Sequence, residues 1–172
     1  MIFKRNYAVR MDLSKQPNWA PLFSIPTLCK MFKDGHLFGK IAEHILESEF
    51  DNFTLAPEGG PFDILSSIGE TIEVKSITKG GFDTSPSAMI GAGRKYDAVG
   101  HAVRINSIAE NGYYILADNR CLPIVTFYPI AANEGLIFTN RNNNKTGKRT
   151  SLQTNVFIEE LLNGAQLTIV DI

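Results

Sequence analysis

Two carboxylates and an ammonium group lie close together in residues 62–77, FDILSSIGETIEVKSI, a stretch that is otherwise mostly apolar. Asp63 stands at the beginning of a short apolar run, and Glu73 and Lys75 alternate with apolar residues in a second run. Side chains two residues apart share one face of a β-strand, so Glu73 and Lys75 are expected to project on the same side. These residue types can bind a cation and activate a water molecule.

The turn between the two runs determines whether Asp63 joins this pair. Residues 62–66 and 71–77 are predicted strands of a hairpin, and if it is centred on Ile68, Asp63 lies directly opposite Glu73. Opposed residues have Cβ atoms about 5 Å apart, so the two carboxylates repel each other. The repulsion is relieved if the strand end is exposed, if one acid is protonated, or if a cation lies between them. A register shifted by one residue would place Asp63 on the other face.

The third alternative predicts a particular chemistry. Mg²⁺ prefers hard oxygen ligands, usually one or two carboxylates together with waters and a substrate phosphate. A cation held by Asp63 and Glu73 would polarise a phosphate and acidify a bound water. The Lys75 ammonium would help to generate hydroxide or stabilise the charge that develops at phosphorus. The three residues therefore predict metal-dependent hydrolysis of a phosphodiester, with a purely structural hairpin as the alternative.

The constellation resembles the PD-(D/E)xK nuclease superfamily, in particular dimeric type II restriction endonucleases that cut to blunt ends. That pattern has an acid at the start of one strand, a turn, and acid-x-Lys on the next strand. Here it reads Pro61-Phe62-Asp63 and then Glu73-Val74-Lys75, with the proline displaced by one position. The resemblance covers residues 58–100 and extends to these segments: Ser76-Ile77, Lys79-Gly80-Gly81-Phe82, Asp83-Thr84-Ser85, Arg94-Lys95-Tyr96 and, later, Asn142-Asn143-Asn144.

The resemblance implies a Mg²⁺-dependent, site-specific endonuclease that acts on double-stranded DNA. It assigns Asp63 and Glu73 to the metal and Lys75 to the attacking water, with Glu58 as a further acidic contact or an ordinary loop acid. Because one active site cuts one strand, cleavage of both strands at a palindrome calls for a twofold dimer. We therefore expect a homodimer, with the N-terminal helical part, residues 1–50, as its interface.

Two other functions are consistent with the same residues. One is a nicking or structure-selective DNA repair nuclease of the same superfamily. The other is a non-catalytic module that binds DNA or protein, in which the charged hairpin is only a scaffold.

Side chains that recognise DNA bases are most concentrated in residues 139–149, TNRNNNKTGKR. Asn pairs with adenine and Arg or Lys with guanine in the major groove, although Asn-rich segments are also common as plain turns. Residues 78–87 leave the catalytic strand directly and would lie near the cleaved phosphate. We expect the following residues of these two loops to contact DNA: Lys79, Thr84, Ser85, Asn142, Asn143, Asn144, Lys145 and Arg149. Three further residues would follow the phosphate backbone: Lys148, Arg94 and Lys95.

The elements that position these residues are predicted from hydrophobic periodicity. Residues 1–26 contain three prolines and are expected to be irregular. Helices are predicted over residues 34–50, over 88–96, and from Ser151 or Thr154 to Asn163-Gly164, where Val156, Phe157, Leu161 and Leu162 would face inward. Besides the hairpin, strands are predicted over residues 101–108, 113–118, 122–130 and 166–170. This order predicts a single α/β (α+β) domain with a mixed central sheet flanked by helices, like a restriction-endonuclease core.

The overall composition is that of an ordinary globular domain. The chain has 172 residues, of which 44% are hydrophobic and 20% charged, with a net charge of −1. A net charge near zero does not by itself indicate nucleic-acid binding. It does not exclude such binding, because positive charges can be segregated on one face. No apolar run is long enough for a membrane span, and neither cysteine belongs to a metal-binding pattern. We expect a cytoplasmic protein without a membrane partner or a nucleotide cofactor.

Overall fold

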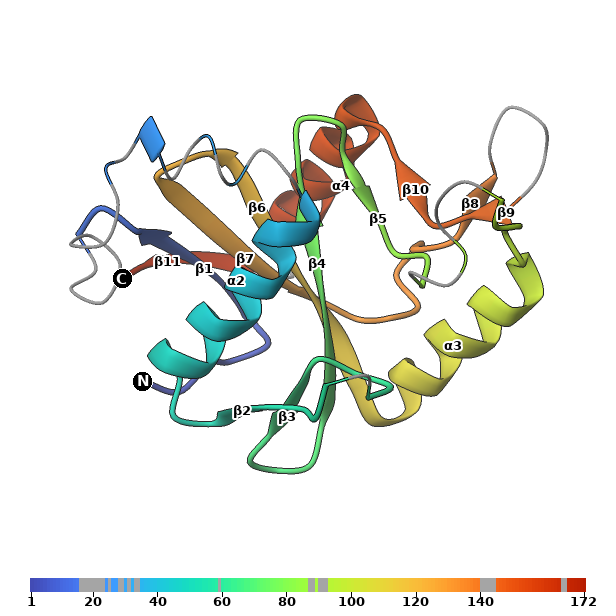
Figure 1. Ribbon diagram of the computed structural model, residues 1–172, viewed down its shortest axis with the longest axis horizontal. Coiled ribbons are helices and arrows are strands. Elements are labelled where there is room, and N and C mark those ends of the chain that lie inside the picture. Colours follow the sequence, from blue (N-terminus) through green and yellow to red (C-terminus); the bar gives the residue numbers. More distant parts are fainter. Residues whose placement is uncertain are drawn as a thin grey trace.

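The computed structural model describes residues 1–15, 24, 26–27, 30, 32, 35–58, 60–86, 89, 93–139, 145–164 and 167–172. Within these ranges three helices and a seven-stranded mixed sheet form one α/β domain (Figure 1), which confirms the predicted fold class. None of the helices in these ranges has the length and apolar run needed to cross a bilayer.

The large sheet places the predicted catalytic strand near its middle. In spatial order its strands are β11 (Thr168–Asp171), β1 (Tyr7–Asp12), β7 (Ile124–Ile130), β6 (Gly112–Cys121), β4 (Thr71–Ile77), β3 (Ile64–Ser66) and β2 (Phe53–Leu55). The β4–β6 and β1–β11 pairs are parallel and the other pairs antiparallel. Because β4 pairs with β6 along its whole length, Glu73 and Lys75 stand on a strand with little freedom to move.

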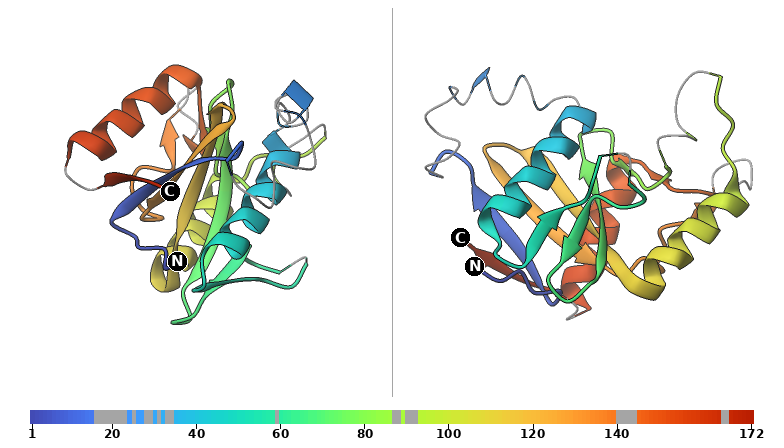
Figure 2. Two further views of the ribbon diagram at one scale, coloured as in Figure 1. Left: turned by 90° about the vertical axis from the view of Figure 1, so that its left-hand side faces the viewer. Right: turned by 60° about the horizontal axis from the view of Figure 1, so that its bottom comes forward.

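Helices cover both faces of this sheet. Helix α2 (Gly35–Glu49) packs Phe38, Ile45 and other apolar residues on one face. Helices α3 (Ala98–Asn111) and α4 (Ser151–Asn163) pack on the opposite face, as the end-on view in Figure 2 shows for α2 and α4. Strand β6 supplies alternate side chains to the two cores, which explains why its sequence is almost continuously apolar.

Two short strand pairs bring distant segments together next to β4. Strand β5 (Phe82–Asp83), which follows β4 after a tight turn, pairs with β10 (Lys148–Arg149). Strand β8 (Phe138–Thr139) pairs with β9 (Lys145–Thr146). The predicted base-reading segment and the loop after the catalytic strand are therefore neighbours, although residues 140–144 lie outside the described residues.

The prediction of a strand over residues 101–108 is wrong, because this segment belongs to α3. Three buried side chains, His101, Ile105 and Ile108, have helical spacing and pack against the sheet. The Asp97 carboxylate accepts a hydrogen bond from the Val99 backbone N–H and caps the first turn. The alternation of apolar and polar residues in HAVRINSI concealed this second periodicity.

Three further predictions differ from the structure. Residues 1–26 are not irregular throughout, because Tyr7–Asp12 forms β1; its prolines begin only after that strand. The helix expected over 88–96 does not reach its predicted end, since residues 93–96 are not helical and Gly93 has a φ of 79°. Val156 was expected to face inward but is 47% exposed, although α4 begins and ends as predicted.

Candidate active site

The hairpin register that the sequence predicts is confirmed. Ile64 pairs with Ile72 and Leu65 with Thr71, so the hairpin is centred on Ile68. Asp63 lies just outside β3, where its backbone N–H donates to the Ile72 carbonyl at 3.0 Å.

Beyond this bond, the Asp63 side chain and not its backbone bonds to β4. Its Oδ2 accepts a hydrogen bond from the Val74 backbone N–H at 2.8 Å. A hydrogen bond to a backbone N–H fixes the direction of the carboxylate, which is held beside Glu73 on the adjacent strand.

Glu73 is almost completely buried and carries two ion pairs. Its Oε1 lies 2.8 Å from Lys75 Nζ, and its Oε2 lies 3.0 Å from Arg104 Nη2. The side chain of Glu73 is only 6% exposed, so these pairs are poorly screened by solvent. The alternation predicted from the sequence therefore does bring Glu73 and Lys75 together. Arg104 comes from α3, and the sequence reasoning missed it because that segment was expected to be a strand.

A third carboxylate reaches the same region from α2. Glu43 is buried, with its Oε2 2.9 Å from Lys40 Nζ. The helical pattern places both residues on the polar side of α2. In the structure this side lines the hollow above the hairpin. The polar residues along one side of the predicted helix were therefore the signal from which Glu43 could have been found.

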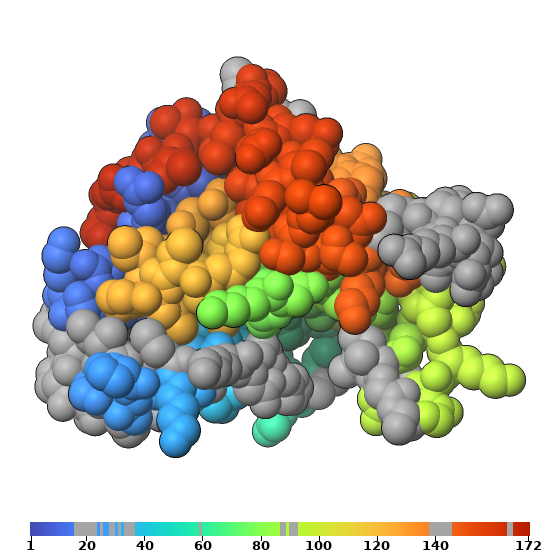
Figure 3. Space-filling view, turned by 90° about the horizontal axis from the view of Figure 1, so that it is seen from above, coloured from blue at the N-terminus to red at the C-terminus, as the bar shows by residue number. Residues whose placement is uncertain are grey.

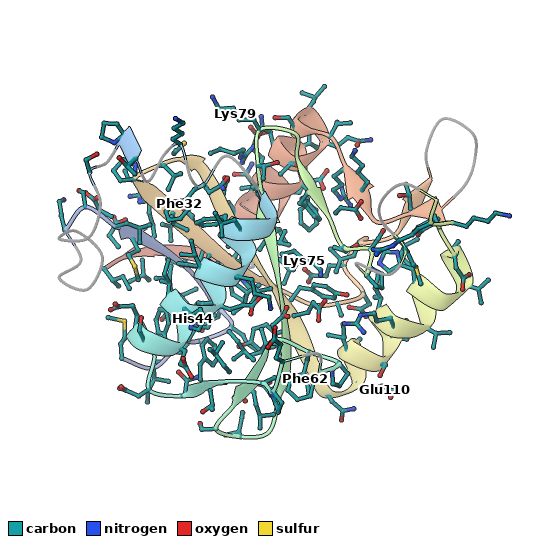
Figure 4. The ribbon with its side chains drawn as sticks, in the orientation of Figure 1. Phe32, His44, Phe62, Lys75, Lys79 and Glu110 are labelled. Atoms are coloured by element: carbon teal, nitrogen blue, oxygen red, sulfur yellow. The ribbon has the colours of Figure 1, made fainter. Side chains whose placement is uncertain are left out.

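These groups line a cleft of about 640 Å³ between α2, the hairpin, β5 and α3. Figure 3 shows the surface hollowed beside the green β4–β5 segment, and Figure 4 shows Lys75 pointing into the space between α2 and α3. The charged side chains that line it are the acids Glu43, Asp63, Glu73 and Asp83 and the bases Lys40, Lys75, Arg104 and Lys148. The cleft thus combines carboxylates for a cation with ammonium and guanidinium groups for a phosphate.

The carboxylates of the cleft influence one another. Burial raises the pKa of Asp63, and the charge of Glu73 raises it further. Burial also raises the pKa of Glu43, and the charge of Asp63 adds to that effect. The hydrogen bond to Glu43 in turn raises the pKa of Lys40. Burial and neighbouring carboxylates therefore both disfavour the charged forms of Asp63 and Glu43.

The residues fit Mg²⁺ in their chemistry. Within the described ranges no ready-made cluster of three or more His, Cys, Asp or Glu side chains surrounds a single point. Mg²⁺ requires less than that, because it usually takes one or two carboxylates and completes its shell with water and phosphate oxygens. Asp63 and Glu73 would supply these oxygens. Burial is the main cause of the raised pKa of Asp63, and the charge of Glu73 adds a repulsion that a cation would relieve. Both oxygens of Glu73 are engaged in ion pairs, so a cation there would compete with Lys75 and Arg104.

The residues after β4 that are expected to contact DNA have different surroundings. Lys79 is exposed in the tight turn between Thr78 and Gly81, as Figure 4 shows at the top of the molecule. Ser85 is buried in the wall of the cleft. Thr84 is buried as well, and its hydroxyl lies 3.3 Å from His101 Nε2 and from two backbone carbonyls. In this structure the Thr84 hydroxyl therefore contributes to packing, and its contact with DNA stays a prediction.

The second segment that is expected to bind DNA is only partly described. Asn142, Asn143 and Asn144 lie outside the described residues, as does the side chain of Lys145. Arg149 stacks over Phe157, with its guanidinium carbon 4.4 Å from the ring centroid, and donates to the Gly135 carbonyl. Burial lowers its pKa. Arg149 therefore holds β10 against α4, and its contact with DNA stays a prediction.

Two other charged residues differ in their relation to the cleft. Lys148, the neighbour of Arg149, is exposed and lines the cleft opposite Asp83. Glu58 is an exposed loop acid that does not line it.

A buried histidine connects the walls of the cleft. His101 Nδ1 lies 2.9 Å from the Tyr96 hydroxyl, and Nε2 lies 3.0 Å from the Thr84 carbonyl. The carbonyl can only accept, so Nε2 carries the proton and Nδ1 accepts from Tyr96. Burial lowers the pKa of His101, which favours this neutral form. Gly147 approaches so closely that an added Cβ would lie 2.3 Å from His101 Cε1.

Comparison of the chain with protein-family models, with curated proteins and with solved structures finds no match to any of them. The function is therefore inferred from the residues of the cleft.

Proposed function

We propose that this protein is a Mg²⁺-dependent, site-specific endonuclease that hydrolyses phosphodiester bonds of double-stranded DNA. The observation that supports this most is the placement of Asp63, Glu73 and Lys75 from adjacent strands in one cleft, with Lys75 Nζ 2.8 Å from Glu73 Oε1. Their arrangement follows the acid, turn, acid-x-Lys pattern of the PD-(D/E)xK nucleases.

The residues divide the chemistry between them. Asp63 and Glu73 would hold the cation, which polarises the phosphate and acidifies a water when it is bound. Lys75 stands beside Glu73 on the same face of β4, where its ammonium can orient the attacking water and stabilise charge at phosphorus. Glu43, buried at the wall of the cleft, adds a third carboxylate that can accept a proton or a water hydrogen bond.

The surroundings of the cleft suit a polyanionic substrate. Lys148 is exposed at the wall of the cleft, and Lys79 is exposed on the nearby turn. Because the net charge of the chain is −1, attraction to DNA would come from this local set and not from the whole protein. We place the protein in the cytoplasm, acting as a homodimer that brings one cleft to each strand.

Cleavage of DNA tests the proposal. Purified protein is incubated with Mg²⁺ and a panel of phage genomes and supercoiled plasmids, and the products are separated on gels. Discrete fragments are expected, and sequencing of their ends would reveal a common site. Nicked circles without linear product would show a nicking enzyme instead. No cleavage of any DNA with Mg²⁺ or Mn²⁺ would contradict the proposal.

A further inference from the structure

Arg104 is the one described guanidinium that reaches the cleft from α3. Its Nη2 donates both to Glu73 Oε2 at 3.0 Å and to the Pro61 carbonyl at 2.9 Å. Pro61 precedes Asp63 by two residues, so a single side chain bridges the strand ends that carry both proposed metal ligands. No sequence pattern assigns it a role.

We propose that Arg104 is a positioning residue that exchanges partners during the reaction, pairing with Glu73 in the cation-free protein and with the substrate phosphate once a divalent cation is bound. This inference rests on the proposed function, because it requires a cation at Asp63 and Glu73.

A divalent cation and Arg104 would compete for Glu73. Both of its carboxylate oxygens are engaged, Oε1 by Lys75 and Oε2 by Arg104. A cation that takes Oε2 would lie within a few ångströms of the guanidinium, and two positive groups so close in a poorly screened site repel. Mg²⁺ and Arg104 therefore compete for this oxygen, and binding of one should weaken the other.

The present position of Arg104 leaves it incompletely satisfied. Its Nε is buried and has no hydrogen-bond partner among the described residues. The Tyr114 hydroxyl is also buried without a hydrogen-bond partner among the described residues. Tyr114 is the residue of β6 that pairs with Glu73 of β4. Unpaired buried donors are unfavourable. The side chain of Arg104 remains 30% exposed, so it has a route toward the open cleft.

The structure also indicates where the released guanidinium would go. The cleft that it lines also holds Lys75 and Lys148, the groups that suit a phosphate. A guanidinium presents two parallel N–H donors that match two phosphate oxygens, whereas an ammonium binds as a point charge. Exchange from Glu73 to phosphate would thus satisfy more donors of Arg104 and would couple cation binding to substrate binding.

Calorimetric titration of Mg²⁺ and of Ca²⁺ into the protein without DNA tests the exchange. Arg104→Gln removes the competing charge, so it should bind Mg²⁺ about tenfold more tightly than the wild type. The same variant should bind DNA more weakly in Ca²⁺ and should cleave it more slowly in Mg²⁺. Arg10→Gln is the matched control, since Arg10 pairs with Asp171 on β11, at the far edge of the sheet, and its loss should leave cation affinity unchanged.

The possible results are distinguishable. If the wild type binds Mg²⁺ and cleaves DNA but Arg104→Gln binds Mg²⁺ equally or more weakly, the exchange is overturned and the proposed function stands. If the wild type binds no divalent cation and cleaves nothing, both are overturned. Should Arg104→Gln fail to fold by circular dichroism, Arg104→Lys decides. A lysine binds at a single point, so Arg104→Lys should gain less Mg²⁺ affinity over the wild type than Arg104→Gln would. If Arg104→Lys shows no gain, the exchange is overturned.

Discussion

At the scale of single residues, Asp63 has a structural role, to which the proposed function adds metal binding. Its carboxylate accepts the Val74 N–H and is also repelled by Glu73. Asp63→Asn keeps an oxygen for Val74 and removes the repulsion. We expect its melting temperature to stay equal to that of the wild type or to rise by a few degrees, while Mg²⁺ affinity falls at least tenfold. Thermal denaturation and calorimetry check this, and a clear loss of stability would contradict it.

Lys148 tests whether the cleft binds phosphate. Lys148→Ala should weaken DNA binding in Ca²⁺ for every sequence and should reduce the slope of log affinity against log salt by about 1. Lys4→Ala is the control, because Lys4 is an exposed lysine that does not line the cleft. Fluorescence anisotropy at several salt concentrations measures both. Equal slopes for the two variants would argue against phosphate contact at Lys148.

Sequence alone predicted the inner part of this site. The alternation in β4 and the centre of the turn were sufficient to place Asp63, Glu73 and Lys75, because a hairpin register depends on residues that are adjacent in sequence. Glu43 and Arg104 could not be found in this way, since they come from two helices whose position depends on packing against the sheet. The burial of Thr84 could not be predicted for the same reason: it depends on His101 and Gly147, which lie far from it in the chain.

At the scale of elements, contact between α3, the β5 loop and β10 depends on Gly147. A Cβ there would collide with Thr84 Oγ1 and His101 Cε1, each 2.3 Å away. We expect Gly147→Ala to lower the free energy of unfolding by about 1–3 kcal/mol, as overpacking does in other cores. Gly80→Ala is the control, because the nearest atom to its Cβ would be a side-chain oxygen 3.7 Å away. Urea denaturation of both variants measures the difference, and equal stability would contradict this account.

The same contact should give stability a pH dependence. The folded protein holds His101 with a lowered pKa, so the unfolded chain binds its proton first as pH falls. Stability from His101 is therefore complete above about pH 6.5 and decreases below it. His101→Gln should be less stable at pH 8 and should lose less on acidification to pH 5. His44→Gln, at an exposed position of α2, should keep the wild-type slope in thermal melts.

That pH difference isolates His101. Asp63 and Glu43 have raised pKa values and titrate in the opposite sense, but they do so in the wild type and in both variants. Parallel slopes for wild type and His101→Gln would show that the imidazole is not held neutral.

The elements themselves were predicted unevenly. Helices α2 and α4 follow clear periodicity and the hairpin follows its turn, so these were found. Helix α3 was predicted as a strand because the first half of its sequence also alternates. Strand β1 was not predicted because its apolar run is short and three prolines follow it. In both cases the sheet and its neighbours select the conformation, and a single sequence does not contain that information directly.

At the scale of the whole molecule, the proposed function requires two clefts to cut both strands. We expect sedimentation in solution to give twice the chain mass of 19.0 kDa at the concentrations that linearise plasmid. A monomer under those conditions, together with linear product in one binding event, would contradict the homodimer. In that case there would be no dimer interface to test by substitutions in α2 or in the N-terminal residues.

The central claim is that this cleft performs the hydrolysis, and Lys75→Met tests it most directly. Wild type and variant are purified in parallel and compared for Mg²⁺-dependent cleavage of one DNA and for binding of the same DNA in Ca²⁺. Lys75→Met should cleave at least a hundredfold more slowly while it binds DNA with nearly unchanged affinity. Equal cleavage rates for the two proteins would show that the activity, if any, does not come from this site.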